Sequence, residues 1–131
     1  MVTELRPPQA LVVDDFDGTR DVVCLMLDLL GYDAEGIASG VEALERLETA
    51  SYTVVVSDVV MSGVSGWVVA DHVRQRRPGI AVVLMTRQLT HAMAYRAGHL
   101  GLSVLEKPFS LTALQTATEE ARRGGSSALV G

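Results

Sequence analysis

Polar side chains that could do chemistry stand at the ends of four apolar stretches of the sequence. Asp14 and Asp15 follow residues 10–13, and Asp58 follows residues 52–57. Thr86 follows residues 80–85, and Lys107 comes shortly after residues 102–105. Crowded carboxylates repel one another unless a cation lies among them, and oxygen-only ligands suit a hard divalent ion, Mg²⁺ above all. A carboxylate beside that ion can attack a phosphoryl group and become an acyl phosphate. An ammonium and a hydroxyl can meet the developing phosphoryl oxygens.

The four apolar stretches, and a weaker fifth one, have the character of β-strands. The strong stretches cover residues 10–13, 52–57, 80–85 and 102–105, and the weaker one covers 32–38 and is expected at a sheet edge. The strong stretches are continuously apolar and do not alternate with polar residues. That pattern indicates parallel strands that are covered on both faces.

Segments with helical spacing lie between the strands and after the last one. Helices are expected over 17–30, after Ser39, and over 67–77, 90–98 and 110–123. Asp17, Ser39 and Ser110 are the expected N-caps, and the arginines at 74, 76 and 77 are expected to face solvent. Five βα units predict a three-layer α/β sandwich with a parallel sheet. Because the carboxyl ends of parallel strands share one edge, the five polar residues are expected to converge in one cleft.

Length, composition and charge limit the function further. The 131 residues fit one domain at 10–123, with an expected flexible leader at 1–9 and flexible tail at 124–131. A net charge of −5 without a basic stripe argues against nucleic acid as a partner. No apolar run approaches a membrane span, and the N-terminus lacks the pattern of a signal peptide. The lone Cys24 excludes an internal disulfide, so a cytoplasmic protein is expected.

The pattern of these residues resembles the receiver domains of two-component response regulators. The resemblance covers about residues 10–123. It rests on Asp14-Asp15 after the first strand, Asp58-Val59-Val60-Met61 after the third, Gly66 in the following loop, Thr86 after the fourth, and Lys107-Pro108-Phe109 after the fifth. Each motif alone is weak, whereas together they are highly specific. The resemblance implies a flavodoxin-like fold with five parallel strands in the order 2-1-3-4-5.

The resemblance also implies a function and a role for each site residue. Asp58 would accept a phosphoryl group from a histidine kinase or a phosphotransfer protein, helped by Thr86 and Lys107. Mg²⁺ would be bound by Asp15 and Asp58, by Asp14 through water, and by the backbone carbonyl of Val60. The bond between Lys107 and Pro108 would be cis. The chain would then be a signalling domain and not an enzyme, apart from its own phosphorylation and dephosphorylation.

Four features depart from the family pattern. Ser62 stands where proline is usual, and Arg87 stands where a small residue is usual. Arg87 could point to solvent or fold over the acceptor and gate it. Val104 occupies the place of the family's rotating aromatic switch, and the stretch from Gly98 to Lys107 is slightly long. The downstream partner, or a second copy in a homodimer, is expected on the face around Val104.

Two alternatives stay open at this stage. A pseudo-receiver would have the same fold and bind a partner without being phosphorylated. A haloacid-dehalogenase-type phosphatase would use Asp15 as nucleophile and Asp17 as general acid, since residues 15–19 read Asp-Phe-Asp-Gly-Thr after an apolar strand. That phosphatase needs another acidic pair at a later strand end, whereas Glu119-Glu120 falls within an expected helix, and it leaves Asp58 without a role.

Overall fold

The computed structural model describes residues 6–127, in which strands and helices alternate from the first element to the last. The elements are β1 (Gln9–Val13), α1 (Asp17–Leu29), β2 (Asp33–Ile37), α2 (Gly40–Thr49), β3 (Val54–Asp58), α3 (Gly66–Arg76), β4 (Ala81–Thr86), α4 (His91–His99), β5 (Ser103–Glu106) and α5 (Leu111–Ser127). No helix in the described part of the chain is long and apolar enough to cross a membrane.

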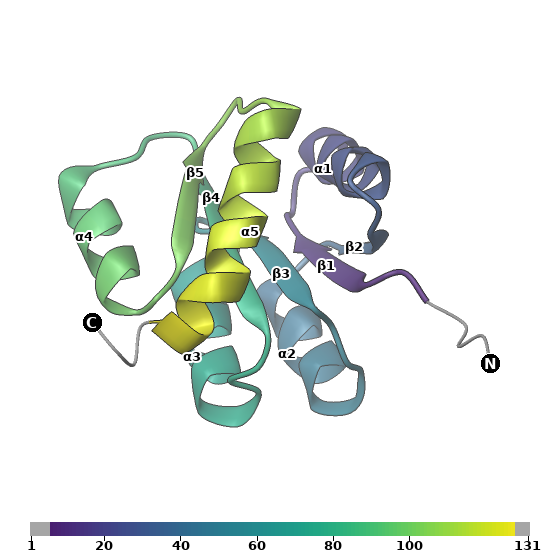
Figure 1. Cartoon of the computed structure of the whole chain (residues 1–131), viewed down its shortest axis with the longest axis horizontal. Helices are drawn as coiled ribbons and strands as arrows, with labels where there is room; N and C mark the ends of the chain where they lie inside the picture. The colour runs from purple at the N-terminus through teal and green to yellow at the C-terminus, as the bar shows by residue number, and fades with distance from the viewer. Residues whose placement is uncertain (1–5, 128–131) are drawn as a thin grey trace.

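The sheet has the strand order β2-β1-β3-β4-β5, and every neighbouring pair is parallel. Helices α1 and α5 lie in front of the sheet in Figure 1, and α2 and α3 lie behind it. This arrangement confirms the predicted three-layer, flavodoxin-like α/β fold and its strand order. β2 is an edge strand, as its weaker apolar character predicted.

The core consists of two apolar clusters, one on each face of the sheet. Leu11 and Val13 of β1 belong to one cluster, and Ala10 and Val12 belong to the other. Neighbouring strand residues point to opposite faces, so a strand that is covered on both sides must be apolar throughout. All six residues of β4 are accordingly buried. Burial on both faces therefore explains the continuous apolar runs in the sequence.

Two of the three expected N-caps are confirmed. The hydroxyl of Ser39 accepts the backbone N–H of Glu42 at 3.1 Å, and that of Ser110 accepts the N–H of Ala113 at 3.0 Å. The prediction for Asp17 is wrong, because Asp17 is already the first residue of α1 and Phe16 precedes it as a cap residue without a side-chain hydrogen bond. The backbone N–H of Phe16 instead donates to the Asp14 carboxylate at 3.0 Å.

The last helix is longer than the sequence predicted. α5 reaches Ser127, whereas the glycines at 124 and 125 had indicated an end near Arg123. The predicted leader and tail lie in part outside the described residues, at 1–5 and 128–131, so these two boundaries stay predictions.

Some side chains face a different way from the predicted one. Arg77 was expected to face solvent, but its guanidinium is partly buried and donates to the Leu47 carbonyl at 2.6 Å and to the Ser51 hydroxyl at 3.1 Å. The apolar face of α1 is wider than the core can cover. Its buried residues are Val23 and Leu27, while Val22, Leu25 and Leu29 are more than half exposed.

Candidate functional site

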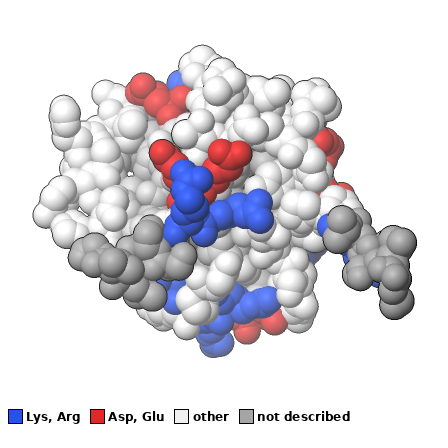
Figure 2. All heavy atoms as spheres, in the orientation of Figure 1, with Lys and Arg blue, Asp and Glu red and all other residues white. Residues whose placement is uncertain are grey.

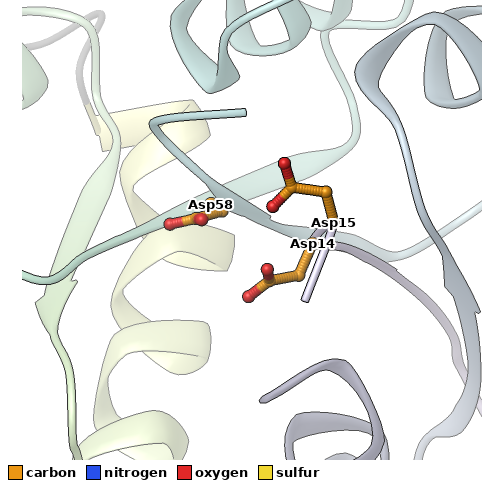
Figure 3. Close-up of side chains that lie close together, drawn as sticks. All are labelled: Asp14, Asp15 and Asp58. Atoms are coloured by element: carbon orange, nitrogen blue, oxygen red, sulfur yellow. The ribbon is translucent and has the colours of Figure 1, made fainter. Parts of the chain in front are cut away.

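Three carboxylates meet at the carboxyl edge of the sheet. Asp14 and Asp15 directly follow β1, and Asp58 is the last residue of β3, the strand beside it. Figure 3 shows the three side chains close together. Each offers an oxygen atom, and these oxygens lie within 4.8 Å of one another. The structure thus brings together the acidic residues that the sequence had placed at one edge.

Asp14 is the most rigidly held of the three. Its side chain is fully buried, and its carboxylate accepts a hydrogen bond from the Lys107 ammonium at 2.9 Å as well as the one from the N–H of Phe16. Its own backbone N–H donates to the Ile37 carbonyl of β2 at 3.2 Å. A buried carboxylate is tolerated only when it is paired and hydrogen-bonded, and Asp14 meets that condition.

Lys107 also contacts Asp58, with 3.2 Å between its Nζ and a carboxylate oxygen. Burial raises the pKa of Asp58 above its usual value, and the negative charges of Asp14 and Asp15 add to this rise, while Lys107 opposes it. One ammonium therefore does not balance the three carboxylates. A site with this excess of negative charge and with only hard oxygen donors fits a divalent cation such as Mg²⁺.

Asp15 is held more loosely. It is exposed, and its carboxylate accepts one hydrogen bond, from the backbone N–H of Ser62 at 3.3 Å. Ser62 lies in the loop that follows β3. Gly66 closes this loop so tightly that a Cβ atom there would lie 2.3 Å from the Asp58 carbonyl oxygen. The loop therefore requires glycine at Gly66, and it sets the position of Ser62 relative to Asp15.

The side chain of Val60 is 75% exposed in the same loop. It is apolar, so the backbone carbonyl is the only group of this residue that could bind a metal ion. The role of this carbonyl stays a prediction.

Thr86 ends β4 beside the site, but its hydroxyl is engaged elsewhere. It accepts the backbone N–H of Gln88 and donates to the Gln88 carbonyl, both at 3.3 Å. The backbone carbonyl of Thr86 accepts the N–H of Lys107 at 2.8 Å, which joins the ends of β4 and β5. The peptide bond between Lys107 and Pro108 is cis, as predicted. The structure thus brings Thr86 to the edge of the site without directing its hydroxyl at Asp58.

Two residues near the site were not identified from the sequence. Glu106 lies at the end of β5, and its carboxylate accepts the backbone N–H of Leu89 at 3.0 Å, which holds the loop after β4. Arg20 of α1 donates to the backbone carbonyl of Asp14 at 2.8 Å. Glu106 could have been identified from the sequence, because it directly precedes Lys107. No local pattern marked Arg20, because its contact depends on how α1 packs against β1 and β2.

Arg87 is exposed, and within the described part of the chain it makes no hydrogen bond or ion pair. It lines a groove of about 610 Å³ together with Phe16, Lys107 and Pro108. Arg87 therefore shares this groove with Lys107, which contacts Asp14 and Asp58.

The face around Val104 has a hollow. A groove of about 520 Å³ lies there, and its lining includes small side chains of β5 and of the helices α4 and α5 on either side, among them Ala94, Ala97, Ala113 and Ala117. Val104 itself is partly buried. No aromatic side chain lines this groove among the described residues.

The contacts of Asp17 do not support the phosphatase alternative. The side chain of Asp17 is 83% exposed, and its carboxylate pairs with Arg20 instead of joining the acidic cluster. Glu119 and Glu120 lie within α5 and not at a strand end. Asp58, which has no role in that mechanism, lies in the cluster.

Comparison with known proteins agrees with this geometry. The family model for the response regulator receiver domain matches residues 10–119. Ethylene receptor 2 of Arabidopsis thaliana is 31% identical over 119 residues, which cover 86% of this chain and 15% of the receptor. The sensor kinase CckA of Brucella abortus (strain 2308) is 34% identical over 113 residues, which cover 84% of this chain and 12% of the kinase. The chain therefore spans less than a sixth of the length of these two relatives.

Among solved structures, the response regulator protein TrrA from Thermotoga maritima is similar over 87% of this chain and 98% of its own. Its sequence is 25% identical and the TM-score is 0.77. That structure was determined in complex with Mg²⁺ and BeF.

Proposed function

This chain belongs to the family of response regulator receiver domains, a family of signalling domains of two-component systems, and we propose that Asp58 is its phosphoacceptor. The observation that carries the proposal is the convergence of Asp58, two further carboxylates and Lys107 at one edge of the sheet. Asp58 has an oxygen beside an ammonium and is less buried than Asp14, so a donor can reach it.

We propose that Mg²⁺ is held by Asp15 and Asp58, by Asp14 through water, and by the carbonyl of Val60. The oxygen donors support this assignment, as do burial and the charges of Asp14 and Asp15, which together raise the pKa of Asp58. When bound, the ion supplies positive charge to the phosphoryl oxygens and lowers the repulsion between them and the carboxylates. The complex of TrrA with Mg²⁺ and BeF supports Mg²⁺ as the cation by similarity.

In the transfer step, a carboxylate oxygen of Asp58 attacks the phosphorus atom of a phosphohistidine. A P–O bond forms as the P–N bond breaks, and the electron pair of that bond leaves on the histidine nitrogen. Lys107 lies at hydrogen-bond distance from both Asp14 and Asp58, so its ammonium can hold a phosphoryl oxygen after the transfer. The Thr86 hydroxyl would leave Gln88 and donate to another phosphoryl oxygen.

The proposed partners are a histidine kinase or phosphotransfer protein and a downstream protein or second copy that reads the face around Val104. Val22 of α1 is 53% exposed and lines the same groove as Lys107, which suits an apolar contact with the donor. In the orientation of Figure 1, charged side chains gather over α5, whereas the surface over α1 is mostly uncharged. A cytoplasmic location is part of the same proposal, since the lone Cys24 suits a reducing compartment.

Intact mass after incubation with acetyl phosphate and Mg²⁺ tests the proposal. We expect a phosphoryl adduct on the wild type and on Asp71→Asn, a control on the exposed face of α3, and none on Asp58→Asn. Absence of an adduct on every variant would support the pseudo-receiver. An adduct that survives Asp58→Asn but not Asp15→Asn would restore the phosphatase alternative.

A further inference from the structure

We propose that Arg20 is a positioning residue for the Mg²⁺ site, and that Gly36 on the edge strand β2 provides the space that Arg20 needs. Arg20 acts through the backbone: it holds the peptide group that joins Asp14 to Asp15. The inference rests on the proposed function in one respect, namely that Mg²⁺ binds at this acidic cluster.

The side chain of Arg20 is anchored at two points. One guanidinium nitrogen donates to the backbone carbonyl of Asp14 at 2.8 Å, and the other donates to the carboxylate of Asp17 at 2.6 Å. Although Arg20 lies on a surface helix, its side chain is only 17% exposed. Hydrogen bonds from a charged donor are stronger than neutral ones, so the guanidinium is a firm attachment for this carbonyl.

The carbonyl that Arg20 holds decides how Asp15 is presented. The pairing of β1 with both neighbouring strands ends at Val13, so the Asp14 carbonyl lies beyond the sheet ladder. A peptide group is planar; holding its oxygen therefore fixes the plane from which the Cα of Asp15 leaves. Among the described residues, the carboxylate of Asp15 has only the 3.3 Å hydrogen bond from Ser62. The direction of the Asp15 carboxylate therefore depends on the backbone, whereas the Asp14 carboxylate is held by its own hydrogen bonds.

Gly36 explains how the arginine reaches this carbonyl. A Cβ atom at Gly36 would lie 3.0 Å from the Cγ of Arg20 and 3.2 Å from its Cδ, and 3.1 Å from the Sγ of Cys24. The aliphatic part of Arg20 thus lies against the bare backbone of β2. A Cβ atom at this position would require Arg20 or Cys24 to shift by a few tenths of an ångström, and a shift of Arg20 would disturb its contact with Asp14.

A competing effect has the opposite sign. A guanidinium near an acidic cluster repels a divalent cation, so removal of Arg20 for this reason alone would strengthen Mg²⁺ binding. The ion pair with Asp17 offsets much of that charge. The direction of the change in Mg²⁺ affinity therefore distinguishes positioning from repulsion.

The test is a Mg²⁺ titration of the unphosphorylated protein, followed by amide chemical shifts. We expect Arg20→Met to raise the Kd for Mg²⁺ about 10-fold, the lower end of the range for residues that orient metal ligands. Arg20→Lys keeps a cationic donor and should recover part of the loss. Arg74→Met is the matched control, since Arg74 makes the same i,i+3 ion pair with Asp71 but lies away from the site.

Gly36→Ala tests the same inference without touching the arginine. We expect it to weaken Mg²⁺ binding in the same direction, whereas Gly79→Ala, where a Cβ meets nothing within 4 Å, should leave the Kd unchanged. Urea denaturation of the same variants without Mg²⁺ distinguishes a positioning role from a purely structural one. A purely structural role would lower the free energy of unfolding and leave the Kd of the folded protein for Mg²⁺ unchanged.

An unchanged or lower Kd in Arg20→Met and Gly36→Ala would overturn the positioning role while the wild type still binds Mg²⁺. A wild type whose amide shifts do not respond to Mg²⁺ would overturn the proposed metal site, and the role of Arg20 with it.

Discussion

At the scale of single residues, the site carries more negative than positive charge, and a few hydrogen bonds hold its side chains in place. Lys107 contacts two of three carboxylates, and burial keeps the pKa of Asp58 raised despite that ammonium. In the proposed function, this excess of negative charge attracts the cation, and the bound cation then favours the phosphoryl group. Arg87 is a further cation that lines a groove together with Lys107, and it has no hydrogen-bond or ion-pair partner among the described residues.

We predict that Arg87→Ala shortens the lifetime of the phosphoryl group on Asp58. An exposed arginine can contact a phosphoryl oxygen and hinder an attacking water, and such a contact contributes up to about 1 kcal/mol, or roughly a fivefold change in rate. The decay of the adduct, followed by intact mass after removal of the donor, measures it. Equal decay in Arg87→Ala and wild type would show that the arginine only faces solvent.

At the scale of elements, the ends of neighbouring strands are tied to one another. The Thr86 carbonyl accepts the N–H of Lys107, and the Glu106 carboxylate accepts the N–H of Leu89. The loop after β4 is thereby attached to the strand that carries Lys107. A shift at the end of β4 would therefore act directly on β5 through these hydrogen bonds.

We predict that Glu106→Ala loosens the loop after β4. The N–H of Leu89 then loses its acceptor, so its amide hydrogen should exchange about 10-fold faster, as expected for the loss of a hydrogen bond to a charged group, at about 1.5 kcal/mol. Hydrogen exchange followed by NMR measures this rate. Glu119→Ala, an exposed change on α5, is the control, and equal exchange in both variants would contradict the role of Glu106.

At the scale of the whole molecule, the acidic site costs folding stability. A carboxyl group whose pKa is higher in the folded than in the unfolded state binds its proton more tightly when folded. Its contribution to stability is therefore complete below the unfolded pKa and is lost as the pH rises through the folded pKa. For Asp58 this loss begins as the pH rises through the usual range of aspartate, because its pKa is raised by burial and by the charges of Asp14 and Asp15.

We predict that Asp58→Asn raises the free energy of unfolding at pH 7 without Mg²⁺. The neutral amide avoids both burial of charge and repulsion by Asp14 and Asp15, the causes that raise the pKa of Asp58. The difference from wild type should shrink as the pH falls below the usual range of aspartate, because the wild-type carboxyl group then takes up its proton. Urea denaturation at several pH values measures it, and a variant less stable than wild type at pH 7 would contradict this reading.

The sequence by itself determined the alternation of strands and helices, because continuous apolar runs and helical spacing reflect local geometry and burial. It also determined that the polar residues meet at one edge, since parallel strands share their carboxyl ends. Those two inferences predict that Asp14, Asp15, Asp58 and Lys107 lie close together. The motifs around them were enough for the family.

The contacts that hold the site and its surroundings in place became visible in the tertiary structure alone. Arg20 reaches the Asp14 carbonyl across Gly36, Glu106 holds the loop after β4, and Arg77 binds the Leu47 carbonyl of α2. The sequence pattern did not reveal these contacts, because each joins a side chain of one element to the backbone of another. They depend on how helices pack on the sheet, and packing is settled by side chains from several elements at once.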